Sequence, residues 1–224
     1  NWIYMSSKDC DITDKDSFYE YLLEVKPDAI IHLAARVGGI KDNVEKQADF
    51  YYLNSLINLN VLQAAHNLNI NRVLSCLSTC AFPDTIKNYP FNEGDLFSGK
   101  PAVSNLSYGM TKRMLKIASD SYRTHLYVKD LAKIIPVLLN KHNSAVPIIV
   151  APDENISIND AVQTFIKLVK KDIKVCYNNK LDGQYRKDGS NKMLKTIIKK
   201  FKFTSLDDGL KETYEWYRNE NSIC

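Results

Sequence analysis

A tyrosine and a lysine stand four residues apart in the stretch LSYGMTK, residues 106–112. On a helix, residues four apart share one face and lie about 6 Å apart along the axis. A lysine ammonium close to a phenol favours the phenolate, and so lowers the pKa of a tyrosine from its ordinary value of about 10. Tyr108 beside Lys112 could therefore exchange protons with a substrate near neutral pH.

A serine at the end of a predicted strand could complete this arrangement. RVLSCLS (72–78) is typical of a buried strand, and Ser78 closes it. Ligands of open α/β sheets bind beyond the carboxyl ends of the strands. A hydroxyl there could hold a carbonyl oxygen that Tyr108 protonates while hydride reaches the carbon. A YxxxK pair alone arises by chance on many helices, and Ser78 alone could be a turn residue. Their joint placement favours the functional interpretation.

Strands and helices alternate along the first half of the chain. DAIIHLAA is apolar almost throughout, as strands are when a parallel sheet buries both of their faces. The alternation predicts an α/β fold with a doubly wound parallel sheet of the Rossmann type. We expect strands at 2–5, 28–35 and 72–78, and helices at 14–25, 43–68 and 104–122, with Tyr52, Leu56, Leu59 and Leu62 on the core side of the second helix.

The second half is less regular. We predict a nucleotide-binding domain over 1–122 and a smaller, mainly substrate-binding lobe over 123–224, with elements that return to the first domain. The expected strands are 125–128, 146–151 and 173–177, and the expected helices are 129–141, 157–170, 190–199 and 205–219.

Composition narrows the class of protein. The 224 residues are 45% hydrophobic and carry a net charge of +4, with acidic and basic residues interspersed. The densest basic cluster, 192–202, alternates with apolar residues, as a solvated helix face does, so we expect no nucleic-acid partner. No apolar run approaches the roughly 20 residues that a membrane span needs. No secretory signal is visible.

The cysteines favour a reducing compartment. There are five, an odd number, and no spacing suits a zinc site, so we expect no metal. Thiols that stay reduced point to the cytoplasm.

Several stretches resemble one enzyme family over most of the chain. They are SSKDCDITD (6–14), PDAIIHLAARVGGI (27–40), NSLINLNVLQAA (54–65), LSTCAFP (77–83), YGMTK (108–112), RTHLYVKDLA (123–132) and DGQYRKDGSNKML (182–194). The chain resembles the extended short-chain dehydrogenase/reductases, and among them the NADPH-dependent 3,5-epimerase/4-reductases of a GDP-linked 4-keto-6-deoxy sugar. The YxxxK pair is generic to that superfamily, whereas STC before an aromatic-Pro pair is more specific.

The resemblance implies catalytic roles. Tyr108 would be the acid/base at the 4-keto oxygen, Lys112 would hold the nicotinamide ribose, and Ser78 would bind the sugar oxygen. Cys80 would remove the acidic protons at carbons 3 and 5. The family uses a histidine as the opposing acid. None of the four histidines here, at 32, 66, 125 and 142, lies in the matching motif.

The resemblance also implies binding residues. For NADPH these are Lys8, Asp9 and Asp11 near the adenosine half, Ala34 and Ala35 at the sheet edge, and Ser78, Tyr108 and Lys112. For the GDP-sugar they are Arg123, Asp182 and Lys187. Asn54 either supports the active-site lysine through water or bonds backbone within its helix.

Two family segments have no counterpart. One is the first strand with its GxxGxxG turn, and the other falls between Tyr122 and Arg123. We expect both to belong to a longer chain. Two alternatives stay open: a UDP-sugar 4-epimerase with tightly held NAD, and a non-catalytic, reductase-like binding protein. A homodimer through helices 43–68 and 104–122 is also expected.

Overall fold

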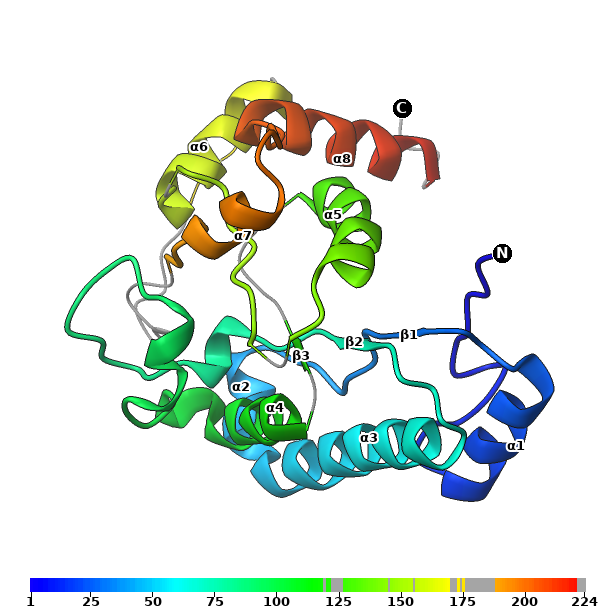
Figure 1. Ribbon diagram of the computed structural model, residues 1–224. Coiled ribbons are helices and arrows are strands. Elements are labelled where there is room, and N and C mark those ends of the chain that lie inside the picture. Colours follow the sequence, from blue (N-terminus) through cyan, green and yellow to red (C-terminus); the bar gives the residue numbers. More distant parts are fainter. Residues whose placement is uncertain are drawn as a thin grey trace.

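The computed structural model describes residues 1–118, 120–121, 127–144, 146–154, 156–169, 173, 175 and 188–220. In Figure 1, α1 to α4 form the lower part of the molecule and α5 to α8 the upper part. The helices are α1 (Lys15–Val25), α2 (Ile40–Glu45), α3 (Gln47–Asn67), α4 (Leu106–Ala118), α5 (Val128–Lys141), α6 (Ile158–Val169), α7 (Lys192–Ile197) and α8 (Leu206–Glu220), with short 3-10 turns η1 (Thr79–Ala81), η2 (Glu93–Phe97) and η3 (Val103–Asn105).

Three parallel strands lie between these parts: β1 (Ile30–His32), β2 (Val73–Ser75) and β3 (Asp120–Ser121). Their order in the sheet is β1-β2-β3. The predicted strands at 28–35 and 72–78 are confirmed, although each is shorter than expected.

The two faces of the sheet pack against different helices. Ile30 and Val73, which are paired in register, contact the cluster that α1 and α3 form with Phe18 and Val61. Their neighbours Ile31 and Leu74 point to the opposite face, because side chains alternate along a strand. There they join the cluster of α5 and α7. The described sheet is therefore covered on both faces, as a doubly wound fold requires.

The predicted core side of α3 is only partly right. Leu62 packs against the cluster that holds Leu77 and Leu115, and Leu56 is half-buried. Tyr52 and Leu59 are each 63% exposed, whereas three asparagines of the same helix are buried. Each asparagine has a partner in another segment: Asn54 bonds backbone atoms of Arg36, Asn58 bonds His32, and Asn60 donates to the carbonyls of Ile12 and Thr13. A buried amide is tolerated when it is hydrogen-bonded, so the polarity of these residues did not reveal which face of α3 points inward.

Several predicted boundaries also need correction. The helix expected at 104–122 ends at Ala118, because residues 120–121 pair with the open edge of β2. The helix expected at 43–68 is divided at Lys46. Residues 2–5 form no strand, and 2–4 are exposed.

In the second half, the predicted strands fare worse than the helices. Tyr127 precedes α5 and Val128 begins it, so these two residues are not in a strand. Residues 146–151 are buried from 147 onward, yet they belong to none of the three described strands. Most of 173–177 lies outside the described residues. The four predicted helices are confirmed within a few residues.

Long-range contacts fasten the second half in place. Phe91 forms a parallel bridge with Gly189. The buried Asp130 carboxylate accepts hydrogen bonds from Thr204 N and Oγ1, at 2.6 and 2.9 Å, and so braces α5 against the segment before α8. None of the described helices combines the length and hydropathy that a membrane span needs.

Candidate functional site

Helix α4 lies directly on the turn that follows β2. A Cβ on Gly109 would come within 2.4 Å of the Cys80 carbonyl oxygen and 3.1 Å of Pro101 Cβ. Neither backbone nor proline can yield enough space, so the contact requires glycine at this helical position. The close approach brings the face of α4 that holds the YxxxK pair against η1.

Two cations of α4 bind carbonyl groups on either side of Cys80. Lys112, only 1% exposed, donates from Nζ to the Cys76 carbonyl at 2.9 Å. Arg113 donates from Nε to the Ala81 carbonyl at 2.5 Å. These two hydrogen bonds fix the segment from the end of β2 to η1 against α4.

Tyr108 is buried beside the lysine, with 6% of its surface exposed. Lys112 Nζ lies 5.9 Å from the centroid of the Tyr108 ring. The predicted proximity of ammonium and phenol is therefore present, at a distance suited to electrostatic interaction with the ring.

Ser78 and Cys80 lie at the beginning of the same turn. Ser78 caps η1, and its Oγ accepts from Cys80 N at 3.2 Å. Cys80 is half-buried, and its Sγ accepts from Asn105 Nδ2 at 3.0 Å. Asn105 was missed in the sequence. Its place three residues before Tyr108, one turn away, is the signal that could have found it.

The carboxyl end of β1 lies at the same edge of the sheet. Ala34 and Ala35 follow this strand and are half-buried. The loop beyond them is held by Asn54, which accepts from Arg36 N at 2.9 Å and donates to Arg36 O at 3.0 Å. Asn54 also donates to Phe50 O within α3. Of its two interpretations, the one in which it bonds backbone is confirmed, and the loop contact was unforeseen.

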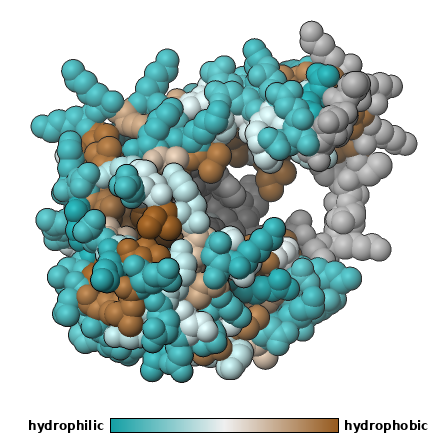
Figure 2. Space-filling model, turned by 90° about the vertical axis from the view of Figure 1, so that its right-hand side faces the viewer, coloured by the Kyte–Doolittle hydropathy of each residue, from teal (hydrophilic) through white to brown (hydrophobic). Residues whose placement is uncertain are grey.

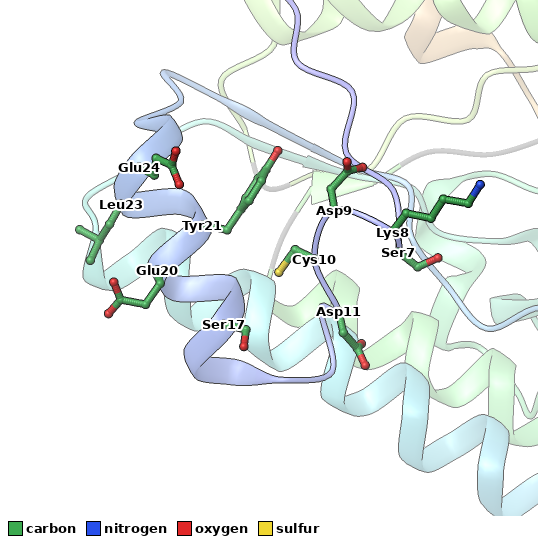
Figure 3. A pocket seen from close by; sticks show the side chains of 10 residues that line it. All are labelled: Ser7, Lys8, Asp9, Cys10, Asp11, Ser17, Glu20, Tyr21, Leu23 and Glu24. Carbon is green, nitrogen blue, oxygen red and sulfur yellow. The ribbon is translucent and has the colours of Figure 1, made fainter.

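The residues predicted near adenosine line a separate, broad depression against α1 (Figure 3). Lys8 is exposed and extends away from α1, whereas Cys10 points toward the helix. Asp9 accepts from Ser6 Oγ and Ser6 N, and these bonds lower the pKa of its carboxyl below the ordinary value. Asp11 likewise accepts from Thr13. Both aspartates thus shape the turn that borders the depression.

The structure brings Ser78, Cys80, Tyr108 and Lys112 together. It places Lys8, Asp9 and Asp11 in the other depression, whose lining includes no residue of η1 or α4. Three predicted substrate-binding residues, Arg123, Asp182 and Lys187, lie outside the described residues.

His32 on β1 is a buried titratable group, and it lies close enough to the assembly for the Lys112 ammonium to affect its pKa. Its Nε2 lies 3.1 Å from Asn58 Oδ1, an acceptor, so Nε2 carries the proton. Burial lowers the pKa of His32 to about 4, and the Lys112 ammonium acts in the same direction. At neutral pH the ring is therefore uncharged, and its Nε2 proton is held by Asn58.

The His32 pKa predicts an acid sensitivity. Between pH 6.5 and about 4 the unfolded chain binds a proton at His32 that the folded protein does not, so stability falls as the pH is lowered. From pH 7 to 4.5 this amounts to about 2–3 kcal/mol. Urea unfolding at pH 7 and pH 4.5 measures this loss. Between the two pH values, the free energy of unfolding should fall by about 2–3 kcal/mol less in His32→Gln than in the wild type. Carboxylates titrate in both proteins and cancel, so equal losses would contradict the assignment.

Comparison with known proteins agrees with this geometry. The sequence profile of the NAD dependent epimerase/dehydratase family matches residues 5–124. The GDP-L-fucose synthase of Dictyostelium discoideum is 29% identical over 96% of this chain and 86% of its own length. The probable GDP-L-fucose synthase of Drosophila melanogaster is also 29% identical, over 96% of this chain and 88% of its own length.

One of these alignments is longer than this chain. The alignment with the Dictyostelium protein spans 276 positions, and this chain has 224 residues. At least 52 aligned positions, the difference between 276 and 224, therefore have no counterpart here. The family profile ends at residue 124, two residues beyond the predicted junction after Tyr122.

Solved structures share the fold. A GDP-L-fucose synthetase from Naegleria fowleri superimposes with a TM-score of 0.89 at 25% identity, covering 100% of this chain and 86% of that one. The same enzyme bound to NADP gives a TM-score of 0.82. A UDP-glucose 4-epimerase from Thermotoga maritima, at 14% identity and a TM-score of 0.83, shows that the fold is shared and no more. Because the family profile covers more than half of the chain, and the parallel sheet and YxxxK helix stand where that profile matches, the protein belongs to the NAD dependent epimerase/dehydratase family.

Proposed function

We propose that this protein is an NADPH-dependent GDP-L-fucose synthase, which epimerises carbons 3 and 5 of GDP-4-keto-6-deoxy-D-mannose and reduces carbon 4. The grouping of Ser78, Cys80, Tyr108 and Lys112 where α4 meets η1 carries the proposal. The GDP-L-fucose synthases among its relatives support it, and one related structure holds NADP. Neither a UDP-sugar 4-epimerase nor a non-catalytic protein is favoured by an observation of comparable weight.

The residues present fit a dinucleotide at the sheet edge. Ala34 and Ala35 are small where the chain leaves β1, and Lys112 brings a buried ammonium to the end of the neighbouring strand. Lys112, Tyr108 and Ser78 would hold the nicotinamide side, and Lys8, Asp9 and Asp11 the adenosine side. The cofactor, when bound, supplies the hydride that reduces carbon 4.

Epimerisation is assigned to Cys80. The thiolate sulfur takes the proton from carbon 3 or 5, an S–H bond forms, and the C–H electron pair moves into the carbonyl to give an enolate. Ser78 would donate to the oxygen that gains charge. A second acid must return a proton to the other face. Of the three described histidines, His32 is buried with Asn58, His66 is exposed near the end of α3, and His142 bonds the Val146 carbonyl.

Reduction is assigned to Tyr108. Its phenol gives a proton to the carbonyl oxygen as hydride reaches the carbon, and the Lys112 ammonium favours the phenolate left behind. We also propose that Arg123, Asp182 and Lys187 bind the GDP-sugar. Residues 123–224 would mainly form the substrate lobe, and the enzyme would work in the cytoplasm, as the cysteine pattern indicates.

The test is a product assay. Purified protein with NADPH and GDP-4-keto-6-deoxy-D-mannose should consume NADPH and form GDP-L-fucose, identified by chromatography and NMR. UDP-galactose with NAD is the control substrate. Conversion of the UDP-sugar without NADPH consumption would overturn the proposal in favour of a 4-epimerase.

We further propose a homodimer through α3 and α4. Tyr52 and Leu59 on α3 are each 63% exposed, and Met114 on α4 is 47% exposed. Figure 2 shows apolar patches on the lower part of the molecule, which holds these helices. Tyr52 and Leu59 lie seven residues apart, the spacing of one apolar helix face. Two exposed apolar side chains on one face of α3 support the pairing of that face with another copy.

Light scattering should give twice the chain mass at micromolar concentration. Leu59→Glu should shift the protein to monomer, because a charge at a helix-packing surface is left desolvated. Ile158→Glu, on the exposed side of α6, is the matched control and should stay dimeric. A wild-type protein that is monomeric at about 10 µM would contradict the proposal.

A further inference from the structure

Asn58 joins two parts of the fold that hold different halves of the proposed site. Its side chain on α3 is 6% exposed. Its Oδ1 lies 3.1 Å from His32 Nε2 on β1, and its Nδ2 donates to the Thr111 carbonyl on α4 at 3.4 Å. These partners are 26 and 53 residues away along the chain. One buried amide therefore connects a strand of the sheet with α4.

The bond to α4 falls within the turn that holds the YxxxK pair. Thr111 lies between Tyr108 and Lys112, is 1% exposed, and donates from Oγ1 to the Tyr108 carbonyl at 2.8 Å. Lys112, the next residue, binds the Cys76 carbonyl near the end of β2. Asn58 therefore acts on the backbone of the turn that presents the phenol and the ammonium.

The bond to β1 leads to the edge proposed for the cofactor. His32 is the last residue of β1, and Ala34 and Ala35 follow it. Figure 1 shows α3 and α4 side by side below the strands, and the two helices pack on each other. Apolar packing is non-directional, so by itself it resists a slide or rotation of α4 only weakly. A hydrogen bond has a preferred direction, and the amide of Asn58 therefore fixes α4 relative to β1.

We propose that Asn58 is a positioning residue for reduction, which sets the place of Tyr108 relative to the dinucleotide at the end of β1. This inference rests on the proposed function. In that reaction hydride passes from NADPH to the carbonyl carbon, and the Tyr108 proton passes to the carbonyl oxygen. The two donors belong to different elements and must reach adjacent atoms. Asn58 itself contacts neither substrate nor cofactor in this assignment and exchanges no proton.

The test compares the rate of reduction with binding. Asn58→Leu keeps the approximate shape of the side chain and removes both hydrogen-bonding groups. The single-turnover rate of NADPH oxidation with GDP-4-keto-6-deoxy-D-mannose should fall about 10-fold, since a misplacement of 1 Å can cost about 100-fold. The Kd for NADPH, measured by fluorescence titration, should stay nearly unchanged, because the loss affects the reaction step rather than binding. A wild-type rate in the folded variant overturns the inference.

A second buried asparagine of α3 provides the matched control. Asn60 is 7% exposed and donates to the carbonyls of Ile12 and Thr13, which belong to the segment before α1. Asn60→Leu removes two hydrogen bonds from the same helix and should lower the melting temperature, yet leave the rate of reduction unchanged. An equal loss of rate in Asn60→Leu would overturn the inference, because any destabilisation of α3 would then suffice.

A double variant separates positioning from stability. Asn58→Leu leaves the buried His32 Nε2 proton without its acceptor, and His32→Leu/Asn58→Leu replaces both polar partners by apolar groups. The double variant should therefore regain part of the melting temperature that Asn58→Leu loses. The rate of reduction should stay low, because the tie between β1 and α4 is still missing. A rate that recovers together with the melting temperature would show that Asn58 acts through stability alone.

Amide hydrogen exchange provides a measurement that needs no substrate. Peptides from α4 should exchange faster in Asn58→Leu than in the wild type or Asn60→Leu, because α4 has lost a contact with the sheet. If the wild type makes no GDP-L-fucose, the proposed function fails, and this exchange still decides the placement of α4. Faster exchange then supports the role of Asn58 in holding α4, and unchanged exchange overturns it.

Discussion

Tyr108→Phe should lower the rate of keto-sugar reduction by at least about 100-fold, the usual lower range for loss of a general acid. The substitution removes the phenol oxygen and keeps the buried ring, so α4 should still rest on η1 and NADPH should bind with nearly unchanged affinity. NADPH oxidation followed by absorbance measures the first quantity, and fluorescence titration measures the second.

A second tyrosine provides the matched control for this experiment. Tyr214→Phe on α8 removes the same atom from a ring that packs edge-on against Phe165, and it should leave turnover unchanged. Near-normal turnover in Tyr108→Phe would show that the proton comes from another group, and the role given to the YxxxK pair would then be wrong.

Cys80→Ser should separate the two chemistries. A hydroxyl is a far weaker acid than a thiol, whose pKa is ordinarily about 8.5, so serine yields almost no anion at neutral pH. Deuterium incorporation at carbons 3 and 5 in heavy water should fall at least about 100-fold. The proton that Tyr108 provides for reduction comes from a different element, so the variant should still oxidise NADPH slowly and form an unepimerised 6-deoxy sugar.

Cys10→Ser is the control for the Cys80 experiment. Cys10 packs in the cluster of α1 and α3, away from α4, and its loss should leave the exchange intact. Should Cys80→Ser fold well and exchange deuterium normally, Cys80 would be only a packing residue beneath the loop that leads to Pro83.

Several structural features could be predicted from the sequence because the interactions that produce them are local. Asp14 caps α1 by accepting from Asp16 N and Ser17 N, residues two and three positions away. The apolar run at 28–35 predicted a strand buried on both faces, and its neighbours Ile30 and Ile31 do face opposite layers. The YxxxK spacing placed Tyr108 and Lys112 on one helix face by helical geometry alone.

The tertiary structure decided which polar groups the interior holds. Asn58 and Asn60 face inward because their hydrogen-bond partners lie there. These partners, His32 and the carbonyls of residues 12 and 13, are 26 to 48 residues away along the chain. This orientation leaves Tyr52 and Leu59 outside, against the apolar pattern of α3.

The site shows the same division. The types and order of Ser78, Cys80, Tyr108 and Lys112 were evident from the sequence, whereas the contact of Asn105 with Cys80 spans 25 residues and depends on how closely α4 approaches η1. Periodicity and capping act within a few residues, so they determine where helices and strands form. The partner of a buried polar group depends on free energies of desolvation and hydrogen bonding that are defined only once distant segments meet.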